Sequence, residues 1–294
     1  MHRLRLWFVL VAVLLSLPCA GQGSTPLLYE VTSETTTLYL FGTIHVGTRE
    51  LYPLSAPVEA AFAASGALAL EADPTDQTAN AAALAGSVYR PPDNLERHIS
   101  PDLYRNLLAK LPQIGLPVEY ARALKPHLLA MTITVGEVLR LGYEPALGLD
   151  HHFAQRARRE GKPIVELESM LEQMQMLESL SDAVKEDMLH AALASLGTQE
   201  LREELDALAA AWKGGDADGI ARALARGMEG MDEASARELE ARVYVERNEA
   251  MAQKLEAMLG GRTVHFVAVG AGHLTGTAGL PALLEAMGFR VRQR

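Results

Sequence analysis

The chain has 294 residues, of which 49% are hydrophobic and 22% charged, so it is long and apolar enough to bury a large core. This composition excludes an intrinsically disordered protein. The formal net charge is −10, and no basic stripe interleaved with aromatic residues is present, so we expect no nucleic-acid partner, because phosphate contacts need a surplus of Lys and Arg.

Residues 1–23 are predicted to be a secretory signal peptide. His2, Arg3 and Arg5 precede the apolar run LWFVLVAVLLSL (6–17), and small residues follow it. The run is shorter than the roughly 20 residues of a membrane span, although an uncleaved anchor is the alternative. The sequence thus predicts a periplasmic or secreted protein that meets a membrane only through this segment. Cleavage would remove the single cysteine, Cys19, and leave neither disulfides nor a thiol nucleophile.

Strands are predicted near both ends of the mature chain. PLLYEVT (26–32) and TTLYLFG (36–42) flank a polar turn and predict a β-hairpin. A helix over 55–65 then leads to an apolar strand over 66–73, and this strand–helix–strand unit is expected to pair in parallel. A strand over 263–269, a helix near 277–287 and a last strand over 289–293 close the chain.

Residues 76–260 are predicted to be mainly helical, with one short apolar run, KPIVELES (162–169), that ends on acidic residues. The Met-rich segment 170–177 predicts a packed helix face, and 231–259 predicts one long amphipathic helix. The simplest assembly is a single α/β domain over residues 24–294. Its mixed central sheet is formed by the N- and C-terminal β-α units, with a large helical insertion at about 76–260.

Two segments of the same pattern end strands of this predicted sheet. TLYLFGTIHVG (37–47) and VHFVAVGAGHLTG (264–276) each place a histidine, His45 or His273, three positions after a glycine. A glycine there allows a tight turn, and the carboxyl ends of strands in open α/β sheets form ligand crevices. The sequence therefore predicts that both histidines face one crevice, with ordinary hydrogen-bonding histidines as the alternative.

Acidic residues follow two other predicted strands, namely Glu71 and Asp73 after one strand and Glu168 after another. Two imidazoles and a carboxylate are a common donor set for a catalytic divalent metal ion. Such an ion makes bound water nucleophilic at neutral pH, and a second carboxylate can act as general base. We therefore expect a metal site built from His45, His273 and one of these acids.

Other catalytic templates lack their residues. The glycines of 270–276 read GxGxxxG, one residue too long for a dinucleotide fingerprint, and no P-loop or GxSxG motif is present. His151 and His152 are adjacent on a predicted helix and point about 100° apart, so they are not expected to share a metal ion. Asp150 is expected to cap that helix, and Arg247 and Asn248, taken alone, predict a solvated pair.

The chain resembles the TraB/GumN family, which includes pheromone-shutdown proteins of the PrgY type and is related to the Tiki metalloproteases. The resemblance covers about residues 27–292. It rests on LYLFGTIHVG, LALEAD, LKPHLLA, LGLDHHFAQRARREGKPIVELESMLEQMQML, ERNEAM and VAVGAGHLTGTAGLPALLEAMGFRV. Ala72 and Ser169 depart from residues common in the family, and neither is an expected ligand.

The resemblance implies a shared α/β fold of two distant β-α units, each with a GxxH motif, around a helical insertion. By resemblance, His45 and His273 match the motif histidines and Glu71 matches the acid after the following strand. Arg247 and Asn248 match a polar pair on the last long helix, which is therefore expected to face the site. The animal relatives imply divalent-metal-dependent peptidase chemistry.

We therefore expect a secreted or periplasmic hydrolase that uses a divalent ion (Mn, Co or Zn) to act on a peptide or small-molecule substrate. Its expected metal ligands are His45, Glu71 and His273, and its expected catalytic residues are Glu71, Glu168, Arg247 and Asn248. In this scheme Glu168 or Asp73 handles protons, and Arg247 stabilises negative charge. A non-catalytic protein that sequesters a peptide, haem or another small ligand in the same crevice is the alternative. A helical interaction scaffold with an inactive site is a third possibility.

Overall fold

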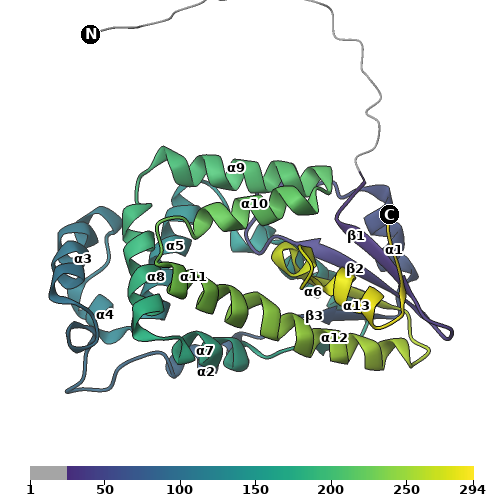
Figure 1. Ribbon diagram of the computed structural model, residues 1–294, viewed down its shortest axis with the longest axis horizontal. Helices are drawn as coiled ribbons and strands as arrows, with labels where there is room; N and C mark the ends of the chain where they lie inside the picture. The colour runs from purple at the N-terminus through teal and green to yellow at the C-terminus, as the bar shows by residue number, and fades with distance from the viewer. Residues whose placement is uncertain (1–24) are drawn as a thin grey trace, which may run out of the picture.

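The computed structural model describes residues 25–294, and the expected signal peptide lies outside them. Within this range, a six-stranded sheet in the order β4-β3-β5-β2-β1-β6 is flanked by helices (Figure 1). The predicted α/β class with a mixed sheet is confirmed. The strands are β1 (Leu28–Thr32), β2 (Thr37–Thr43), β3 (Ala67–Leu70), β4 (Ile164–Glu166), β5 (His265–Gly270) and β6 (Arg290–Gln293).

The sheet joins the two ends of the chain, as the sequence predicts. β1 pairs antiparallel with β2 in the predicted hairpin, and β6 pairs antiparallel with β1. β5 runs parallel to β2 on one side and to β3 on the other, so the expected direct pairing of β2 with β3 is wrong. β5 is buried along almost its whole length, which suits a central strand covered on both faces better than an outer one.

An aromatic cluster anchors two helices to the sheet. Phe62 of α1 (Ala56–Ala64) and Phe153 of α6 (Leu149–Glu160) pack against Phe41 and Phe266 of the two central strands. The closest of these contacts joins the rings of Phe153 and Phe266, whose centroids lie 4.7 Å apart. Tilted and edge-on aromatic pairs at this spacing add stabilisation beyond the buried area.

The chain between β3 and β5 is helical apart from β4 and the connecting turns, as predicted. Its helices are α2 (Gln77–Ala85), α3 (Pro101–Ile114), α4 (Val118–Ala123), α5 (Pro126–Arg140), α6, α7 (Met170–Ser179), α8 (Asp182–Ala194), α9 (Gln199–Gly214), α10 (Ala217–Gly227), α11 (Glu233–Glu240) and α12 (Glu246–Leu259). Helices α3, α5 and α8 build a second apolar cluster, which Figure 1 shows at the end of the molecule away from the sheet.

The predicted long helix over 231–259 is present but is not a uniform α-helix. A π-helical turn, Ala241–Val245, links α11 to α12. A π-turn places an extra residue in the helix and redirects the side chains around it, and such turns are frequent at functional sites. Here it precedes Arg247 directly, so it sets the direction in which that side chain leaves the helix.

The glycine of the first GxxH motif serves close packing and not the tight turn expected from the sequence. Gly42 lies within β2. A Cβ atom there would lie 2.3 Å from Cδ2 of Leu27, and the Gly42 carbonyl accepts a hydrogen bond of 2.7 Å from Nε1 of Trp212. The strand therefore continues past this glycine, and its crowded surroundings are what exclude a larger side chain.

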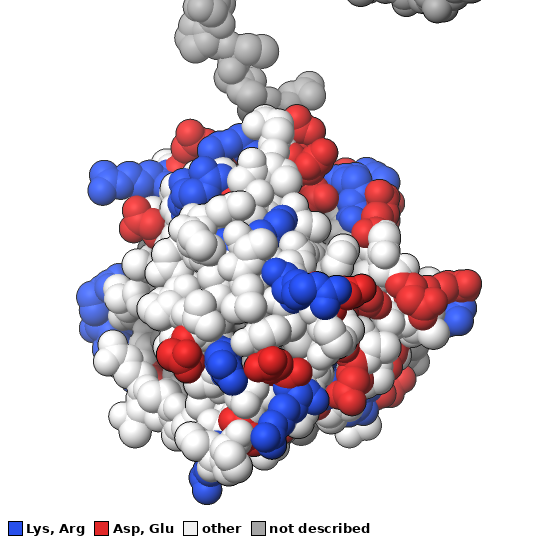
Figure 2. All heavy atoms as spheres, turned by 90° about the vertical axis from the view of Figure 1, so that its left-hand side faces the viewer, with Lys and Arg blue, Asp and Glu red and all other residues white. Residues whose placement is uncertain are grey.

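The helices and the charged surface were compared with the features of membrane spans and nucleic-acid-binding faces. Among residues 25–294, no helix is both long and apolar enough to cross a bilayer. On the face shown in Figure 2, Lys and Arg are interspersed with Asp and Glu, and no basic stripe is visible there.

The start of α6 is pressed against the segment that follows β2. The backbone N–H of Leu149 donates to the carbonyl oxygen of Ile44 at 3.0 Å. A Cβ atom on Gly148 would lie 2.1 Å from the carbonyl oxygen of His45, which is a backbone atom and cannot swing away. This contact fixes the backbone that carries the first motif histidine.

Replacing Gly148 by Ala is therefore expected to lower the free energy of unfolding by about 1–3 kcal/mol, as measured by urea denaturation. Gly136→Ala is the matched control, because a Cβ at this exposed position of α5 meets nothing within 4 Å. The control is expected to be stabilised by about 0.5–1 kcal/mol, since glycine is unfavourable within a helix. Equal stability changes in the two variants would contradict the close approach at Gly148.

Candidate functional site

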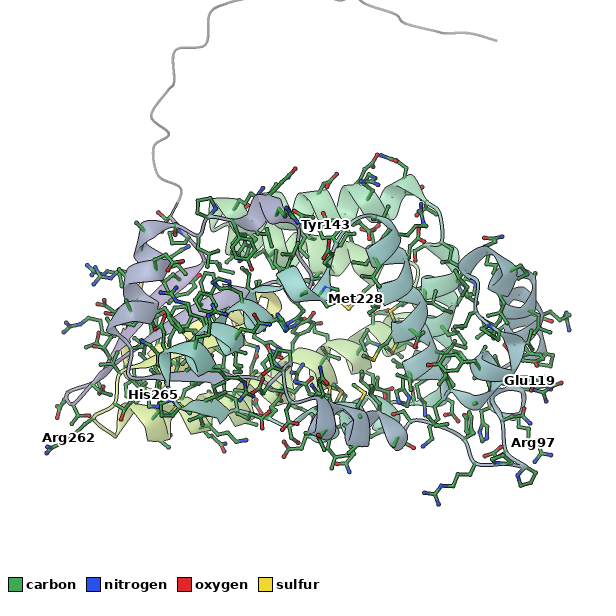
Figure 3. All side chains as sticks on the ribbon, turned by 180° about the vertical axis from the view of Figure 1, so that it is seen from behind. Arg97, Glu119, Tyr143, Met228, Arg262 and His265 are labelled. Atoms are coloured by element: carbon green, nitrogen blue, oxygen red, sulfur yellow. The ribbon has the colours of Figure 1, made fainter. Side chains whose placement is uncertain are left out.

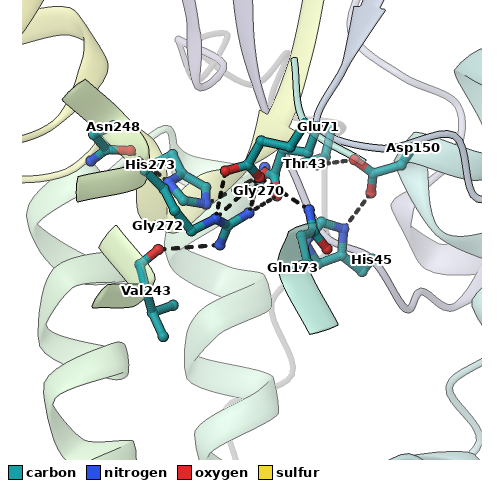
Figure 4. Close-up of polar contacts among 12 residues, drawn as sticks. Thr43, His45, Glu71, Asp150, Gln173, Val243, Asn248, Gly270, Gly272 and His273 are labelled. Carbon is teal, nitrogen blue, oxygen red and sulfur yellow. Dashed lines mark hydrogen bonds and ion pairs between the residues drawn. The ribbon is translucent and has the colours of Figure 1, made fainter. Parts of the chain in front are cut away.

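The carboxyl ends of β2, β3 and β5 meet at one edge of the sheet, where a cavity of about 340 Å³ opens. The strand ends supply one part of its lining and the π-turn with α12 another (Figure 4). The polar groups in the lining are Thr43, His45, Glu71, Gln173, Tyr244, Arg247 and His273. Both motif histidines therefore reach one cavity, together with the acid that follows β3.

Glu71 is a buried carboxylate at the centre of this site, with 7% of its side chain exposed. Its Oε1 accepts a hydrogen bond from the backbone N–H of Gly270, and its Oε2 accepts one of 2.8 Å from Nη2 of Arg247. Burial by itself raises the pKa of this carboxyl group, but the positive charges of His45 and Arg247 and the hydrogen bond from Gly270 favour the ionised form, and the pKa of Glu71 is lowered to about 2. Glu71 is therefore ionised at neutral pH.

Arg247 joins Glu71 to Glu168, the acid that follows β4. Nε of Arg247 donates to Oε1 of Glu168 at 2.9 Å, and Nη2 donates to Oε2 at 2.6 Å. The guanidinium thus makes a bidentate contact with Glu168 and also donates a hydrogen bond to Glu71. Arg247 and Glu168 are only 13% and 12% exposed, so the three side chains form a buried ion triad that connects α12 to the ends of β3 and β4.

His273 is buried in the short turn after β5, and Asn248 holds it in place. Nδ1 of His273 lies 2.6 Å from Oδ1 of Asn248, whose Nδ2 donates to the carbonyl oxygen of Ala278 at 2.8 Å. Because the side-chain nitrogen of Asn248 donates to Ala278, its side-chain oxygen is the atom that faces His273 and accepts a hydrogen bond from Nδ1. Nδ1 of His273 therefore carries the proton, and Nε2 has the lone pair. Asn248, expected to be catalytic, contacts the histidine and does not line the cavity.

The free nitrogen of His273 faces the central carboxylate. Its Nε2 lies 3.5 Å from Oε1 of Glu71. Burial lowers the pKa of His273, so the ring is neutral in this pocket. Two electron-pair donors therefore face each other with no proton between them, an arrangement that a cation placed between them would stabilise.

His45 is held in the same manner from the other side of the cavity. Its Nδ1 lies 2.8 Å from Oδ2 of Asp150, whose Oδ1 accepts a hydrogen bond of 2.7 Å from the hydroxyl of Thr43. The charge of Asp150 raises the pKa of His45 to about 9. Because 63% of the imidazole is exposed, solvent screens part of this attraction. Nε2 faces the cavity, and below about pH 9 it carries a proton that a metal ion would have to displace.

The glycine of the second GxxH motif lies between these groups. A Cβ atom on Gly270 would lie 3.1 Å from Nε2 of His45 and 3.2 Å from Oε1 of Glu71. Both atoms therefore approach the same point at the end of β5, and only a glycine leaves that point open. This close approach is the reason for a glycine at this position.

Two acids differ from the expectation. Asp150 does not cap α6, whose N-cap is Gly148; its carboxylate instead turns toward Thr43 and His45 because it lies on the buried side of the first helical turn. Asp73 pairs with Arg158 and accepts hydrogen bonds from Thr75, and it does not line the cavity. Asp150 is thus the site residue that sequence reasoning missed, and its only signal was its place in the GLDHHF segment.

The donor chemistry fits a divalent cation. Both motif histidines have Nδ1 held by an oxygen acceptor and Nε2 directed to the cavity, the arrangement typical of metal-binding histidines. As the side chains stand in the described part of the chain, however, no three His, Cys, Asp or Glu groups converge into a complete metal site. Arg247 occupies Oε2 of Glu71, which leaves Oε1 as the oxygen turned toward the histidine rings.

Replacing Arg247 by Met is expected to lower the free energy of unfolding by about 3–5 kcal/mol, because two buried carboxylates lose their counter-charge. Urea denaturation at neutral pH measures this change. Arg237→Met on α11 is the control, since Arg237 pairs with Glu233 at an exposed position and such pairs contribute little. If Arg247→Met lowers the free energy of unfolding no more than Arg237→Met does, the ion triad does not stabilise the fold.

Replacing Asp150 by Asn is expected to lower the pKa of His45 from about 9 toward its ordinary value of 6.5. Proton NMR of metal-free protein follows this titration directly. Because the folded-state pKa is raised, the stabilisation is complete below about pH 6.5 and disappears as the pH rises through about 9. Asp150→Asn should lack this pH dependence of stability, and an unchanged His45 titration would contradict the assigned role of Asp150.

Comparisons with known proteins identify the family of the chain. The profile of the TraB/PrgY/gumN family matches residues 27–293. Two relatives, each described as "Uncharacterized protein YbaP", come from Escherichia coli (strain K12) and Shigella flexneri. Each is 27% identical over 144 residues, which are 49% of this chain and 53% of the relative, so the chain spans about half the length of these relatives. No solved structure matches the chain significantly. Because the family profile covers nearly all of the described residues, the chain belongs to the TraB/PrgY/gumN family.

Proposed function

We propose that this protein is a divalent-metal-dependent hydrolase whose centre is the cavity at the ends of β2, β3 and β5. The observation that carries the proposal is the contact of 3.5 Å between the neutral Nε2 of His273 and the ionised Oε1 of Glu71. A buried pair of electron donors of this kind calls for a cation. The family resemblance to metalloproteases supports the same chemistry.

His45, His273 and Glu71 would hold the ion, which we expect to be Mn, Co or Zn. When bound, such an ion polarises a carbonyl group and lowers the pKa of water toward neutrality. Asp150 and Asn248 orient the two rings so that both Nε2 atoms face the cavity. These two residues are positioning groups, because each acts through a histidine.

Arg247 is the residue we assign to stabilising negative charge on the attacked carbonyl oxygen. It lines the cavity and its guanidinium is fixed by Glu71 and Glu168, so it needs no rearrangement when charge develops. Glu168 makes several hydrogen bonds with Arg247, so the geometry favours a positioning role for Glu168 over proton transfer. Asp73 lies outside the cavity lining and is not part of this proposal.

We further propose that the protein acts in the periplasm or outside the cell, on a peptide or another small substrate. The support for this location is the basic and apolar N-terminal segment of the sequence.

The metal proposal is tested by the metal content of purified mature protein after exposure to manganese, cobalt or zinc, followed by desalting. Wild type is expected to retain one ion per chain. The double variant His45→Ala/His273→Ala is expected to retain none, whereas His190→Ala, an exposed control on α8, should bind as wild type does. Hydrolysis of a panel of peptides and esters should follow the metal content.

Equal metal retention by wild type and the double variant would contradict the site. Metal retention without hydrolysis of any substrate would instead favour the alternative of a ligand-sequestering protein built on the same cavity.

A further inference from the structure

A second cavity of about 480 Å³ lies in the helical insertion beside the cavity at the strand ends. The two share four lining residues, Leu208, Leu224, Val243 and Tyr244, which we call the neck. We call the second cavity the apolar chamber. Met228, which lines it, lies in the middle of the molecule in Figure 3, between the sheet and the far helical cluster.

The lining of the chamber is almost entirely aliphatic. Met131, Leu177, Leu205, Met228 and Leu239 line it from five different helices or helix ends, and all are partly exposed. None of these five belongs to the sheet core or to the helical core. Protein interiors are normally packed to crystal-like density, so a concave group of half-covered Met and Leu side chains is space for an apolar ligand.

The chamber cannot satisfy a peptide backbone. Among its lining residues, Glu204 is the only charged side chain and the phenol of Tyr244 the only hydroxyl. Each buried amide without a partner costs free energy, so a stretch of main chain would be disfavoured there. A hydrocarbon chain needs no partners, and flexible Met side chains adapt to its shape.

Two residues of the neck lie beside the turn that carries the second motif histidine. The ring of Tyr244 lies 5.5 Å from that of His273. A Cβ atom on Gly272 would lie 2.7 Å from Cε1 of Tyr244 and 2.9 Å from Cδ1 of Leu224, so both side chains pack closely against this turn. The π-turn brings Val243 and Tyr244 to this place.

Resting on the proposed function, we propose that the chamber receives the aliphatic acyl chain of the substrate while its carbonyl group lies between His45 and His273. Water adds to this carbonyl, the bond to the alcohol or amine breaks, and the leaving group takes up a proton. The products are a fatty acid and the free alcohol or amine. The substrate class is thus an acyl ester or acyl amide with a linear aliphatic chain.

Binding of the acid product tests the chamber without requiring turnover. Calorimetric titration of metal-loaded protein with butanoate, octanoate and dodecanoate is expected to show affinity rising about fourfold for each buried CH₂. Leu205 on α9 lines the chamber but not the cavity at the strand ends, so Leu205→Trp should weaken dodecanoate binding at least about tenfold while leaving butanoate unchanged. Ala210→Trp, exposed on the same helix, is the matched control and should bind as wild type does.

The same series as nitrophenyl esters separates the two proposals. If binding depends on chain length and Leu205→Trp removes this dependence, but no ester is hydrolysed, the result would support the chamber and overturn the proposed hydrolase activity. Affinity and turnover that are independent of chain length, or equal in Leu205→Trp and Ala210→Trp, would overturn the chamber and leave the hydrolase standing.

Discussion

The site depends on one buried carboxylate. Glu71 remains ionised in the core because Arg247, the Gly270 N–H and the positively charged ring of His45 lie around it. An unpaired charge at such a position would cost several kcal/mol, so each of these partners is needed for the others to stay in place. Since the partners come from β2, β5 and α12, the same interaction ties the two ends of the chain to the last helix of the insertion. The side chains that stabilise this part of the fold are therefore the same ones that form the candidate site.

The helical insertion contributes more than cover for the sheet. Its last segment passes through a π-turn, and this irregularity brings Val243 and Tyr244 to the neck and Arg247 to the carboxylates. The chamber beyond the neck lies between the sheet core and the separate helical core, where neither packs its side chains to full density. The insertion thus supplies the positive charge of Arg247 beside the two carboxylates and, in our proposal, the apolar cavity that selects the substrate.

The strands and the two GxxH histidines could be predicted from sequence because short apolar runs that end on glycine, histidine or an acid carry a local signal. The order of the strands could not, since the position of β5 between β2 and β3 depends on burial across the whole sheet. The role of Asp150 also escaped prediction. A residue near a helix start is typical of a cap, and only tertiary contacts show that its carboxylate turns to His45. The reasons for both motif glycines are likewise non-local, because each is set by a neighbour that approaches in space.

X-ray absorption spectroscopy of the zinc-loaded protein shows directly which side chains bind the ion. We expect a first coordination shell with two imidazole nitrogens and at least one carboxylate oxygen, and the loss of one imidazole in each of the single variants His45→Ala and His273→Ala. A shell without imidazole, or one that neither variant alters, would contradict the convergence of the two motif histidines on Glu71.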